Sequence, residues 1–380
     1  MDATLRLLKE LIAIDSVNPS LVQGALGEAA IARAIMEEFG VIGVQTYLQE
    51  AAPGRPNVVG VVEGPGPGRT LMLCGHIDTV GVAGMTRPFE PVEREGRIYG
   101  RGSQDMKSGV AAMIGAARVI TESGGLDAGQ LIIACVVDEE HASVGADALV
   151  TRWRADGAVV TEPTELQVAV AHKGFEWIEV ETEGRAAHGS RPRDGRDAIM
   201  RMGRVLGELE GLDRSLQSGR AHKLVGTASL HASLIEGGRE LSSYPDRCML
   251  QIERRTIPGE PHGIGGSEVE QILAHLQAQD VEFQATCRTL FARAPYEIAS
   301  EHHLPTALLQ SARAAGAASE TTGMSFWTDA AVLGGAGIPS VLFGPTGAGL
   351  HGLEEWVEGR SVLTCRDALV DLARAFCRPG

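Results

Sequence analysis

A chain of 380 residues is too long for one ordinary hydrophobic core, so the length predicts two domains. Hydrophobic residues make up 44% of the chain and charged residues 22%, which is typical of a soluble globular protein. The formal net charge of -15 argues against a nucleic-acid partner, because phosphate binding needs clustered lysine and arginine. No stretch approaches the roughly 18 consecutive apolar residues of a membrane span, so no membrane association is expected.

The N-terminal segment MDATLRLLKELIAIDSVNPS predicts a short amphipathic helix and not a signal peptide. Leu5, Leu8 and Leu11 recur at helical spacing, and Lys9 interrupts any apolar core of a leader. We expect this helix to stop near Asn18-Pro19. The six cysteines of the chain are scattered and form no CxxC pair, so they predict core residues in a reducing, cytoplasmic compartment.

Between residue 1 and about residue 170, short apolar runs alternate with helical patterns. The runs are NVVGVV, TLMLCG, LIIACVV and GAVVT. Continuously apolar strands that alternate with helices predict a parallel or mixed sheet that is buried on both faces. Ligands bind such sheets beyond the carboxyl ends of the strands.

Carboxylates and histidines gather just after these strand ends, in the loop GRGSQD before a predicted helix, and in the late loop GPTGAGLHG. These residues are His76, Asp78, Asp105, Glu139, Glu140, Glu162 and His351. Two histidines and several carboxylates are the ligand inventory of a two-zinc hydrolase, in which metal ions about 3.5–4 Å apart share a water and a bridging carboxylate.

From about residue 174 the pattern changes to alternating strands and amphipathic helices. Their order is strand, helix, strand, strand, helix, strand, which is the order of a ferredoxin-like module. After about residue 293 the first pattern returns and ends in the helix RDALVDLARAFC. The sequence therefore predicts a discontinuous α/β catalytic domain, 1–173 and 293–380, with a smaller α+β domain, 174–292, inserted in it.

These motifs resemble those of the acetylornithine deacetylase, succinyl-diaminopimelate desuccinylase and glutamate carboxypeptidase family of zinc-dependent amidohydrolases. GHIDTV and GRGSQDMKSG resemble that family's G-H-x-D-x-V and G-R-G-x-x-D-x-K-x-G segments, and DEE and TEPT also match. The resemblance spans nearly the whole chain. It implies a mixed-sheet, di-zinc exopeptidase-like catalytic domain with an inserted ferredoxin-like lid and dimerisation domain. It also implies a cis peptide bond after Asp105.

By position, the resemblance implies that His76, Asp105 and Glu162 bind one zinc ion. Asp105, Glu140 and His351 would bind the second zinc ion, so that Asp105 bridges the two. Cobalt is a possible substitute for zinc at both positions.

The resemblance also implies the roles of the residues that surround the metal ions. Glu139 would be the general base, and Asp78 would orient the imidazole of His76 from behind. GRAAHGSRPRDGRDAI resembles a segment whose histidine reaches the active site of the other subunit in a dimer. His188 would then stabilise the tetrahedral oxyanion of that subunit.

Three further positions are candidates for substrate binding. QIERRTIPGE resembles a segment with an arginine that binds a substrate carboxylate. Neighbouring strand residues face opposite sides, so we favour Arg255 for this role and expect Arg254 to be a surface charge. Ser242 stands in a stretch where many relatives have asparagine, a departure that suggests a different acyl group. Gly349 lies in a loop that resembles a substrate-holding loop of the family.

The expected activity is hydrolysis of the amide bond of a small-molecule N-acyl amino acid or small peptide, of the deacetylase or desuccinylase kind. The alternatives are a glutamate carboxypeptidase-like or di/tripeptidase activity, and a non-catalytic binding homologue. The last is disfavoured because Glu139 and all the expected ligands are present. The absence of a GxSxG motif disfavours a serine hydrolase. We also expect a homodimer formed through the inserted domain.

Overall fold

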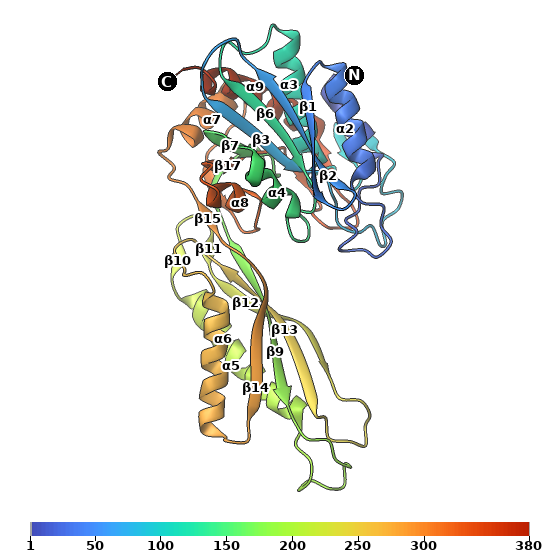
Figure 1. The fold of residues 1–380 in the computed structure, drawn as a ribbon, viewed down its shortest axis with the longest axis vertical. Coiled ribbons are helices and arrows are strands. Elements are labelled where there is room, and N and C mark those ends of the chain that lie inside the picture. The colour runs from blue at the N-terminus through green and yellow to red at the C-terminus, as the bar shows by residue number, and fades with distance from the viewer. Residues whose placement is uncertain (1, 380) are drawn as a thin grey trace. The chain divides into compact units, whose positions relative to one another are not determined.

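The structure is a computed structural model that describes residues 2–379, and its contacts divide the chain into two compact units (Figure 1). Unit 1 contains the residues up to Val170, Ile298–Thr322 and the residues from Thr328 onward. Unit 2 contains Ala171–Glu297 and Gly323–Trp327. The units are described separately below.

A mixed sheet is the core of unit 1. Its strands are ordered β1-β2-β6-β3-β7-β17-β8. The central strands β6, β3, β7 and β17 are parallel, whereas β1, β2 and β8 pair in the antiparallel sense. The strands are β1 Gln45–Ala52, β2 Arg55–Glu63, β3 Thr70–His76, β6 Gln130–Val136, β7 Gly157–Val160, β8 Val168–His172 and β17 Ser340–Leu342. The four apolar runs of the sequence fall on β2, β3, β6 and β7, as predicted.

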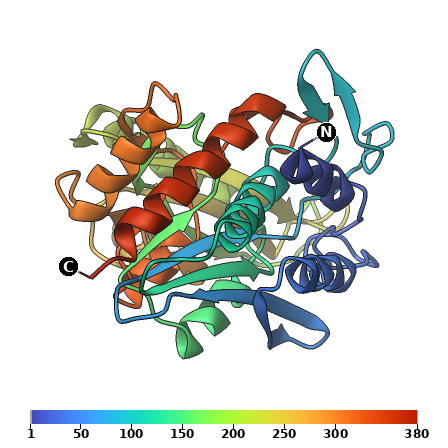
Figure 2. The same cartoon turned by 90° about the horizontal axis from the view of Figure 1, so that it is seen from above.

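Helices cover both faces of this sheet, which buries its central strands (Figures 1 and 2). α3 and α9 pack on one face together with α1 and α7, and α2 lies over β1 and β2 on that face. α4 and α8 pack on the other face. The helices are α1 Ala3–Ile12, α2 Ala29–Val41, α3 Lys107–Glu122, α4 Val144–Arg152, α7 His303–Ala314, α8 Ala330–Gly335 and α9 Gly359–Phe376. A small sheet, β18-β19-β5-β4, completes unit 1; its strands are β4 Val92–Arg94, β5 Arg97–Tyr99, β18 Gly347–Ala348 and β19 Trp356–Glu358. The short strand β16, Thr321–Met324, begins in unit 1 and ends in unit 2.

The first helix ends earlier than the sequence predicts. α1 begins after Asp2, whose carboxylate accepts a hydrogen bond from the backbone N–H of Thr4 at 2.7 Å, and it ends at Ile12 instead of near Asn18. The backbone N–H of Asn18 donates to the carbonyl oxygen of Thr79 at 2.9 Å. Val17 therefore pairs with Thr79, just after β3, in an isolated bridge, and the chain there does not continue the helix.

Unit 2 is built on a four-stranded antiparallel sheet with the order β12-β13-β9-β14. Numbered along the chain, this order is 2-3-1-4, so the predicted ferredoxin-like module is confirmed. α5 and α6 pack on the sheet around a core that includes Ile178, Val205, Leu250 and Phe283. The elements are β9 Gly174–Glu183, α5 Ala198–Ser218, β10 Ala221–His222, β11 Gly226–Thr227, β12 Ser229–Gly237, β13 Arg247–Thr256, α6 Ile264–Gln279, β14 Gln284–Arg293 and β15 Tyr296–Glu297.

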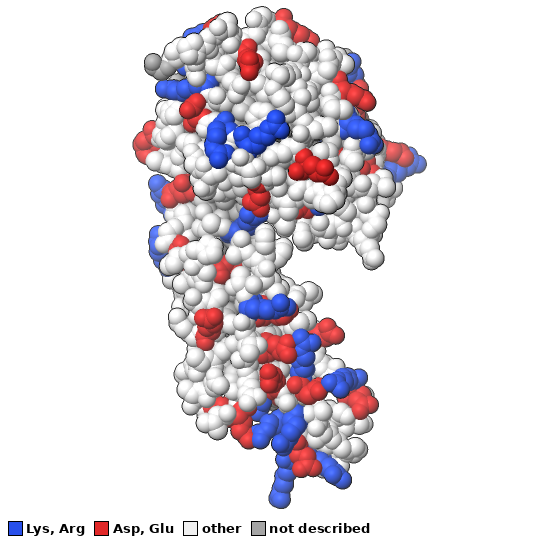
Figure 3. Space-filling model, in the orientation of Figure 1, with Lys and Arg blue, Asp and Glu red and all other residues white. Residues whose placement is uncertain are grey.

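Charged side chains of both signs are interspersed over each unit on the face drawn in Figure 3. On that face the negative net charge of the chain is therefore not gathered into one acidic field. Among residues 2–379, no helix combines the length and the apolar character that crossing a bilayer requires.

Candidate active site

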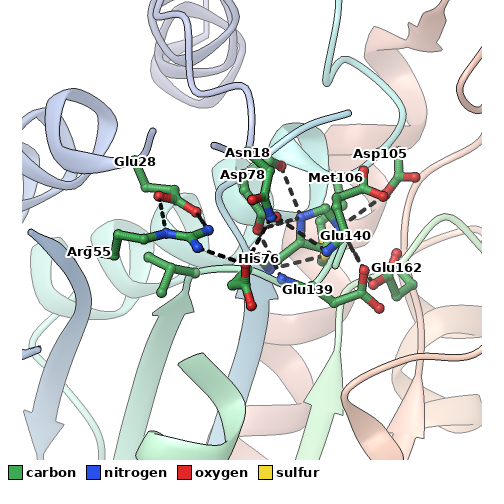
Figure 4. Close-up of polar contacts among 12 residues, drawn as sticks. Asn18, Glu28, Arg55, His76, Asp78, Asp105, Met106, Glu139, Glu140 and Glu162 are labelled. Carbon is green, nitrogen blue, oxygen red and sulfur yellow. Dashed lines mark hydrogen bonds and ion pairs between the residues drawn. The ribbon is translucent and has the colours of Figure 1, made fainter. Parts of the chain in front are cut away.

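Acidic residues and His76 converge at one edge of the unit 1 sheet, beyond the carboxyl ends of its central strands (Figure 4). His76 is the last residue of β3, Glu139 and Glu140 follow β6, and Glu162 follows β7. Because β3 pairs in parallel with both β6 and β7, the three strand ends lie side by side. Asp105 joins them from the loop before α3.

The imidazole of His76 lies at the centre of one group of carboxylates. Its Nε2 atom is 3.0 Å from Asp105 Oδ1, 3.8 Å from Glu162 Oε1 and 3.9 Å from Glu139 Oε2. Its Nδ1 atom is 3.0 Å from the carbonyl oxygen of Asp78, which can only accept a hydrogen bond. Nδ1 therefore carries the proton in the neutral ring, and the lone pair of Nε2 faces the carboxylates.

The imidazole of His351 lies at the centre of a second group. Its Nε2 atom is 3.1 Å from Glu140 Oε2 and 3.2 Å from Asp105 Oδ2. Asp105 thus turns one carboxylate oxygen towards each histidine, which is the arrangement of a bridging carboxylate. Residue 106 follows through a cis peptide bond, so the predicted cis bond after Asp105 is confirmed.

Burial and mutual repulsion disfavour the charged forms of the three glutamates of the cluster. Burial is the largest cause, and repulsion from neighbouring carboxylates adds to it. Together they raise the pKa values of Glu139 and Glu162 well above the usual range of a glutamate, and they raise the pKa of Glu140 to about 7. Hydrogen bonds to Asp105 and Glu140 raise the pKa of His351 to about 10. For Asp105, burial alone would raise the pKa, but hydrogen bonds to His351 and His76 outweigh it and lower the pKa.

This donor set suits metal cations. Glu140 Oε1 is buried and has no hydrogen-bond partner among the described residues. Two groups of side chains each offer three ligand atoms that lie within 4.8 Å of one another. One group is His76, Glu139 and Glu162, and the other is His76, Asp105 and Glu140. Imidazole nitrogen and carboxylate oxygen are the ligands that zinc binds in hydrolases, and divalent cations would relieve the repulsion among the carboxylates.

A buried network supports the turn that carries Glu139 and Glu140. The two oxygens of the Asp78 carboxylate accept the backbone N–H groups of Glu139 and Glu140, each at 3.2 Å. The Asn18 amide donates to Asp78 at 2.8 Å (Figure 4). It also donates to Asp138 at 3.1 Å. The Asp78 carboxylate is 3.6 Å from His76 Nδ1, so its main contacts are with this turn and not with the imidazole.

The same network continues to Arg55 and Glu28. The Arg55 guanidinium forms a two-pronged ion pair with Glu28 (Figure 4). It also contacts Asp138 at 2.8 Å. Sequence reasoning missed Asn18, Glu28, Arg55 and Asp138 as contributors. The only local signal was that Asp138 directly precedes the glutamate pair.

Three of the sequence-predicted site residues belong to unit 2. His188 is exposed, and its Nδ1 atom is 2.8 Å from Ser190 Oγ. The backbone N–H of Gly189 donates to the carbonyl oxygen of Ser242 at 2.7 Å, so the His188 and Ser242 loops lie side by side within this unit. Gly349 belongs to unit 1, where it has a φ of 99° in the loop before His351.

One prediction about the arginine pair is wrong. Arg254 is fully buried in unit 2, where its guanidinium pairs with Glu260 at 2.7 Å and Glu268 at 3.0 Å, so it is not a surface charge. Arg255 remains partly exposed, with its guanidinium over the ring of Phe175.

The fold and the site define a two-unit α/β protein whose mixed sheet carries a cluster of carboxylates and histidines suited to a pair of metal ions. Residues 72–375 match the family described as peptidase family M20/M25/M40, so the chain belongs to this family. It is therefore a hydrolase that acts on amide bonds, and the family resemblance predicted from the sequence is confirmed.

Individual relatives are similar to this chain over nearly its whole length. An acetylornithine deacetylase from Myxococcus xanthus is 31% identical, over 97% of this chain and 96% of the relative. The fold is similar to that of aminopeptidase PepT from Bacillus cereus ATCC 10987, with a TM-score of 0.81, 19% identity and coverage of 99% and 98% of the two chains. It is also similar to that of a dinuclear metal-binding peptidase of the M20 family from Bacillus subtilis, with a TM-score of 0.73, 14% identity and coverage of 98% and 97%.

Proposed function

We propose that the chain hydrolyses the amide bond of an N-acyl amino acid in a metal-dependent reaction and releases a carboxylic acid and a free amine. The proposal is based on the position of Asp105 between the two histidines. Its Oδ1 atom is 3.0 Å from His76 Nε2, and its Oδ2 atom is 3.2 Å from His351 Nε2. A deacylase is favoured over a peptidase because the acetylornithine deacetylase relative is 31% identical over 97% of the chain, whereas aminopeptidase PepT is 19% identical. We propose zinc as the metal, with cobalt as an accepted substitute.

In this proposal each residue of the cluster has one role. His76, Asp105 and Glu162 would hold one metal ion, and His351, Glu140 and Asp105 would hold the other. Two divalent ions bound there would lower the pKa of water and polarise the amide carbonyl. The carbonyl oxygen of Asp78 keeps the His76 ring in the orientation that this requires.

The proton transfers are assigned to Glu139. Glu139 accepts a proton from the attacking water and delivers it to the departing amine nitrogen, which completes the hydrolysis. Its backbone is held by the Asp78 carboxylate, so the position of the base depends on the buried network behind it. Two further assignments come from the family resemblance: His188 stabilises the oxyanion, and Arg255 binds the carboxylate of the amino acid.

Two properties of the whole protein belong to the same proposal. We propose a homodimer that forms through unit 2. We also place the protein in the cytoplasm, because all six of its cysteines are free, as a reducing compartment would keep them.

The proposal is tested with a substrate panel. Zinc-loaded protein is incubated with N-acetylornithine, N-succinyl-diaminopimelate, other N-acyl amino acids and simple or glutamate-terminated dipeptides, with and without EDTA, and cleavage is followed by mass spectrometry. EDTA-sensitive cleavage of N-acyl amino acids is the expected result. Cleavage of dipeptides alone would replace it with the peptidase alternative. No cleavage by protein that holds two metal ions per chain would overturn it.

A further inference from the structure

The loop that presents Asp105 is wrapped around one buried carboxylate, that of Glu355. Its Oε1 atom accepts the backbone N–H groups of Gln104 at 2.8 Å and Asp105 at 3.0 Å. Its Oε2 atom accepts the backbone N–H of Gly102 at 3.0 Å and the guanidinium of Arg101 at 2.6 Å. The Glu355 side chain is 0% exposed, so all of these hydrogen bonds are shielded from water.

Arg101 connects this carboxylate to two other loops of the site. Its Nη2 atom donates to the carbonyl oxygen of Gly352 at 3.0 Å, directly after His351. The same atom donates to the carbonyl oxygen of Gly81 at 3.2 Å, in the segment that follows His76. The Arg101 side chain is 3% exposed. One buried ion pair therefore contacts all three segments that carry His76, Asp105 and His351.

We propose that Glu355 is a positioning residue for the metal centre: with Arg101, it fixes the backbone of Asp105 and of the His351 loop so that both histidines can share one carboxylate. The inference rests on the proposed metal-dependent function. The peptide nitrogen that Glu355 holds belongs to Asp105 itself, so a shift at Glu355 moves both carboxylate oxygens of Asp105 together. A displacement of a few tenths of an ångström suffices to disturb a metal site of this kind.

The plainer interpretation is a buried ion pair that only stabilises the fold. Buried ion pairs are by themselves weak indicators of stability, because desolvation offsets much of the attraction. The two interpretations differ in what they predict for folded protein. A purely structural pair affects the thermal midpoint, whereas a positioning pair also affects metal affinity and the geometry of the bound metal.

The substitution Glu355→Gln tests this directly. Glutamine has nearly the same shape, but it replaces one carboxylate oxygen with an NH₂ group, and every partner of Glu355 is a donor. At least one N–H group of the loop must therefore lose its acceptor and face another donor. Glu354→Gln is the matched control, because Glu354 is the exposed neighbour in the same segment.

The measurements are metal affinity, the visible spectrum of the cobalt-loaded protein, kinetics and the thermal midpoint. Zn²⁺ and Co²⁺ are titrated separately against a competing chelator, well below the thermal midpoint of each variant. We expect Glu355→Gln to bind metal more weakly, with an apparent Kd raised by roughly 10–100-fold, and to change the cobalt absorption bands. We expect kcat to fall with little change in KM. Glu354→Gln should match the wild type in all four measurements.

The outcomes separate this inference from the proposed function. If wild-type protein binds neither Zn²⁺ nor Co²⁺, the proposed function fails. If the wild type binds two ions and folded Glu355→Gln binds them with the same Kd and the same cobalt spectrum, the positioning role is overturned. If Glu355→Gln does not fold, the same measurements are made on Arg101→Gln. That substitution removes the contacts to Gly81 and Gly352 and leaves the three backbone hydrogen bonds to Glu355 in place. A metal Kd and cobalt spectrum unchanged in that variant would likewise overturn the role.

Discussion

Glu139 and Glu140 are neighbours in sequence, but their carboxylates approach different histidines. Glu139 Oε2 is 3.9 Å from His76 Nε2, and Glu140 Oε2 is 3.1 Å from His351 Nε2. We predict that Glu139→Ala lowers kcat by roughly 10²–10⁴-fold while the metal content stays near two ions per chain, because a base is lost and no ligand is. Glu140→Ala should lower the metal content itself.

Metal content by plasma emission spectroscopy and steady-state kinetics distinguish the two variants. Glu37→Ala, at an exposed position on α2, is the control and should match the wild type. Substantial turnover in Glu139→Ala would show that another group is the base. Full metal content in Glu140→Ala would remove Glu140 from the ligand set.

A second residue-scale prediction concerns His172, which is fully buried. Burial lowers its pKa to about 4, so the unfolded chain binds a proton there at higher pH than the folded chain does. The stability that the neutral ring contributes is present above about pH 6.5 and is lost as the pH falls towards 4. We predict that His172→Asn flattens this part of the stability profile by up to about 3 kcal/mol.

The measurement is the difference in unfolding free energy between variant and wild type from pH 7 to pH 4. His275→Asn, at an exposed position on α6, is the control. A difference that does not vary with pH would show that His172 is protonated equally in the folded and unfolded chains.

The residues of the metal cluster could be predicted from the sequence because each has a local signal. His76 and Glu162, for example, directly follow an apolar run that could only be a buried strand. Glu355 has no such signal, because its partner Asp105 is 250 positions away. Asn18 is 120 positions from its partner Asp138. In the sequence, the position of Asn18 before Pro19 indicated only the end of a helix. Residues that act through distant partners become visible only in the fold.

At the scale of elements, the turn between β6 and α4 depends on one cation, Arg55, whose side chain is largely but not fully buried. Arg55 contacts Asp138 at 2.8 Å and pairs with Glu28, whose side chain is 0% exposed. We predict that Arg55→Met destabilises the fold by about 3–5 kcal/mol, because it leaves buried carboxylates without a countercharge. It should also lower kcat, because Asp138 directly precedes the catalytic pair.

A double-mutant cycle tests this prediction. Adding Glu28→Met to Arg55→Met should recover part of the lost stability, with a coupling energy of about 0.5–3 kcal/mol in urea unfolding. The exposed pair Arg6–Glu10 is the control, and Arg6→Met should change stability by less than about 0.5 kcal/mol. Additive effects of the two substitutions would show that Arg55 and Glu28 do not act as a pair.

The element scale also explains the wrong prediction for Arg254. Strand alternation correctly places Arg254 and Arg255 on opposite faces of β13, but it does not say what covers each face. α6 packs beside β9 and β14, and its Glu268 reaches Arg254 from above the sheet. The face that carries Arg254 is therefore the helix-covered face of unit 2. A charge on that face persists only because two glutamates pair with it.

At the scale of the whole molecule, one edge strand of the unit 2 sheet exposes large apolar side chains. β12 is the edge strand, and its only charged side chain is Glu236. Leu234 is 66% exposed and Ile235 is 56% exposed on it. Edge strands that expose apolar side chains and carry few charges tend to pair with another chain. We therefore predict that two copies associate through this edge, and that Leu234→Lys makes the protein monomeric in analytical ultracentrifugation.

Val281→Lys is the control for this experiment. Val281 is 89% exposed in the same unit but precedes β14, at the opposite edge of the sheet. It should leave the dimer intact. A monomeric wild type would contradict the prediction, and a dimeric Leu234→Lys variant would place the interface elsewhere.

The last prediction concerns His188, which the family resemblance assigns to the active site of the other subunit. His188→Ala alone should cost roughly 10²–10³-fold in kcat if the imidazole stabilises an oxyanion. In a heterodimer of His188→Ala and Glu139→Ala chains, one site receives an intact Glu139 from its own chain and an intact His188 from its partner. Heterodimers isolated with two affinity tags should then have about half the wild-type activity per dimer, because one of the two sites is complete. If His188 acts within its own chain, every site lacks one group. The heterodimer would then be no more active than the two homodimers, and the assignment to the partner's site would be wrong.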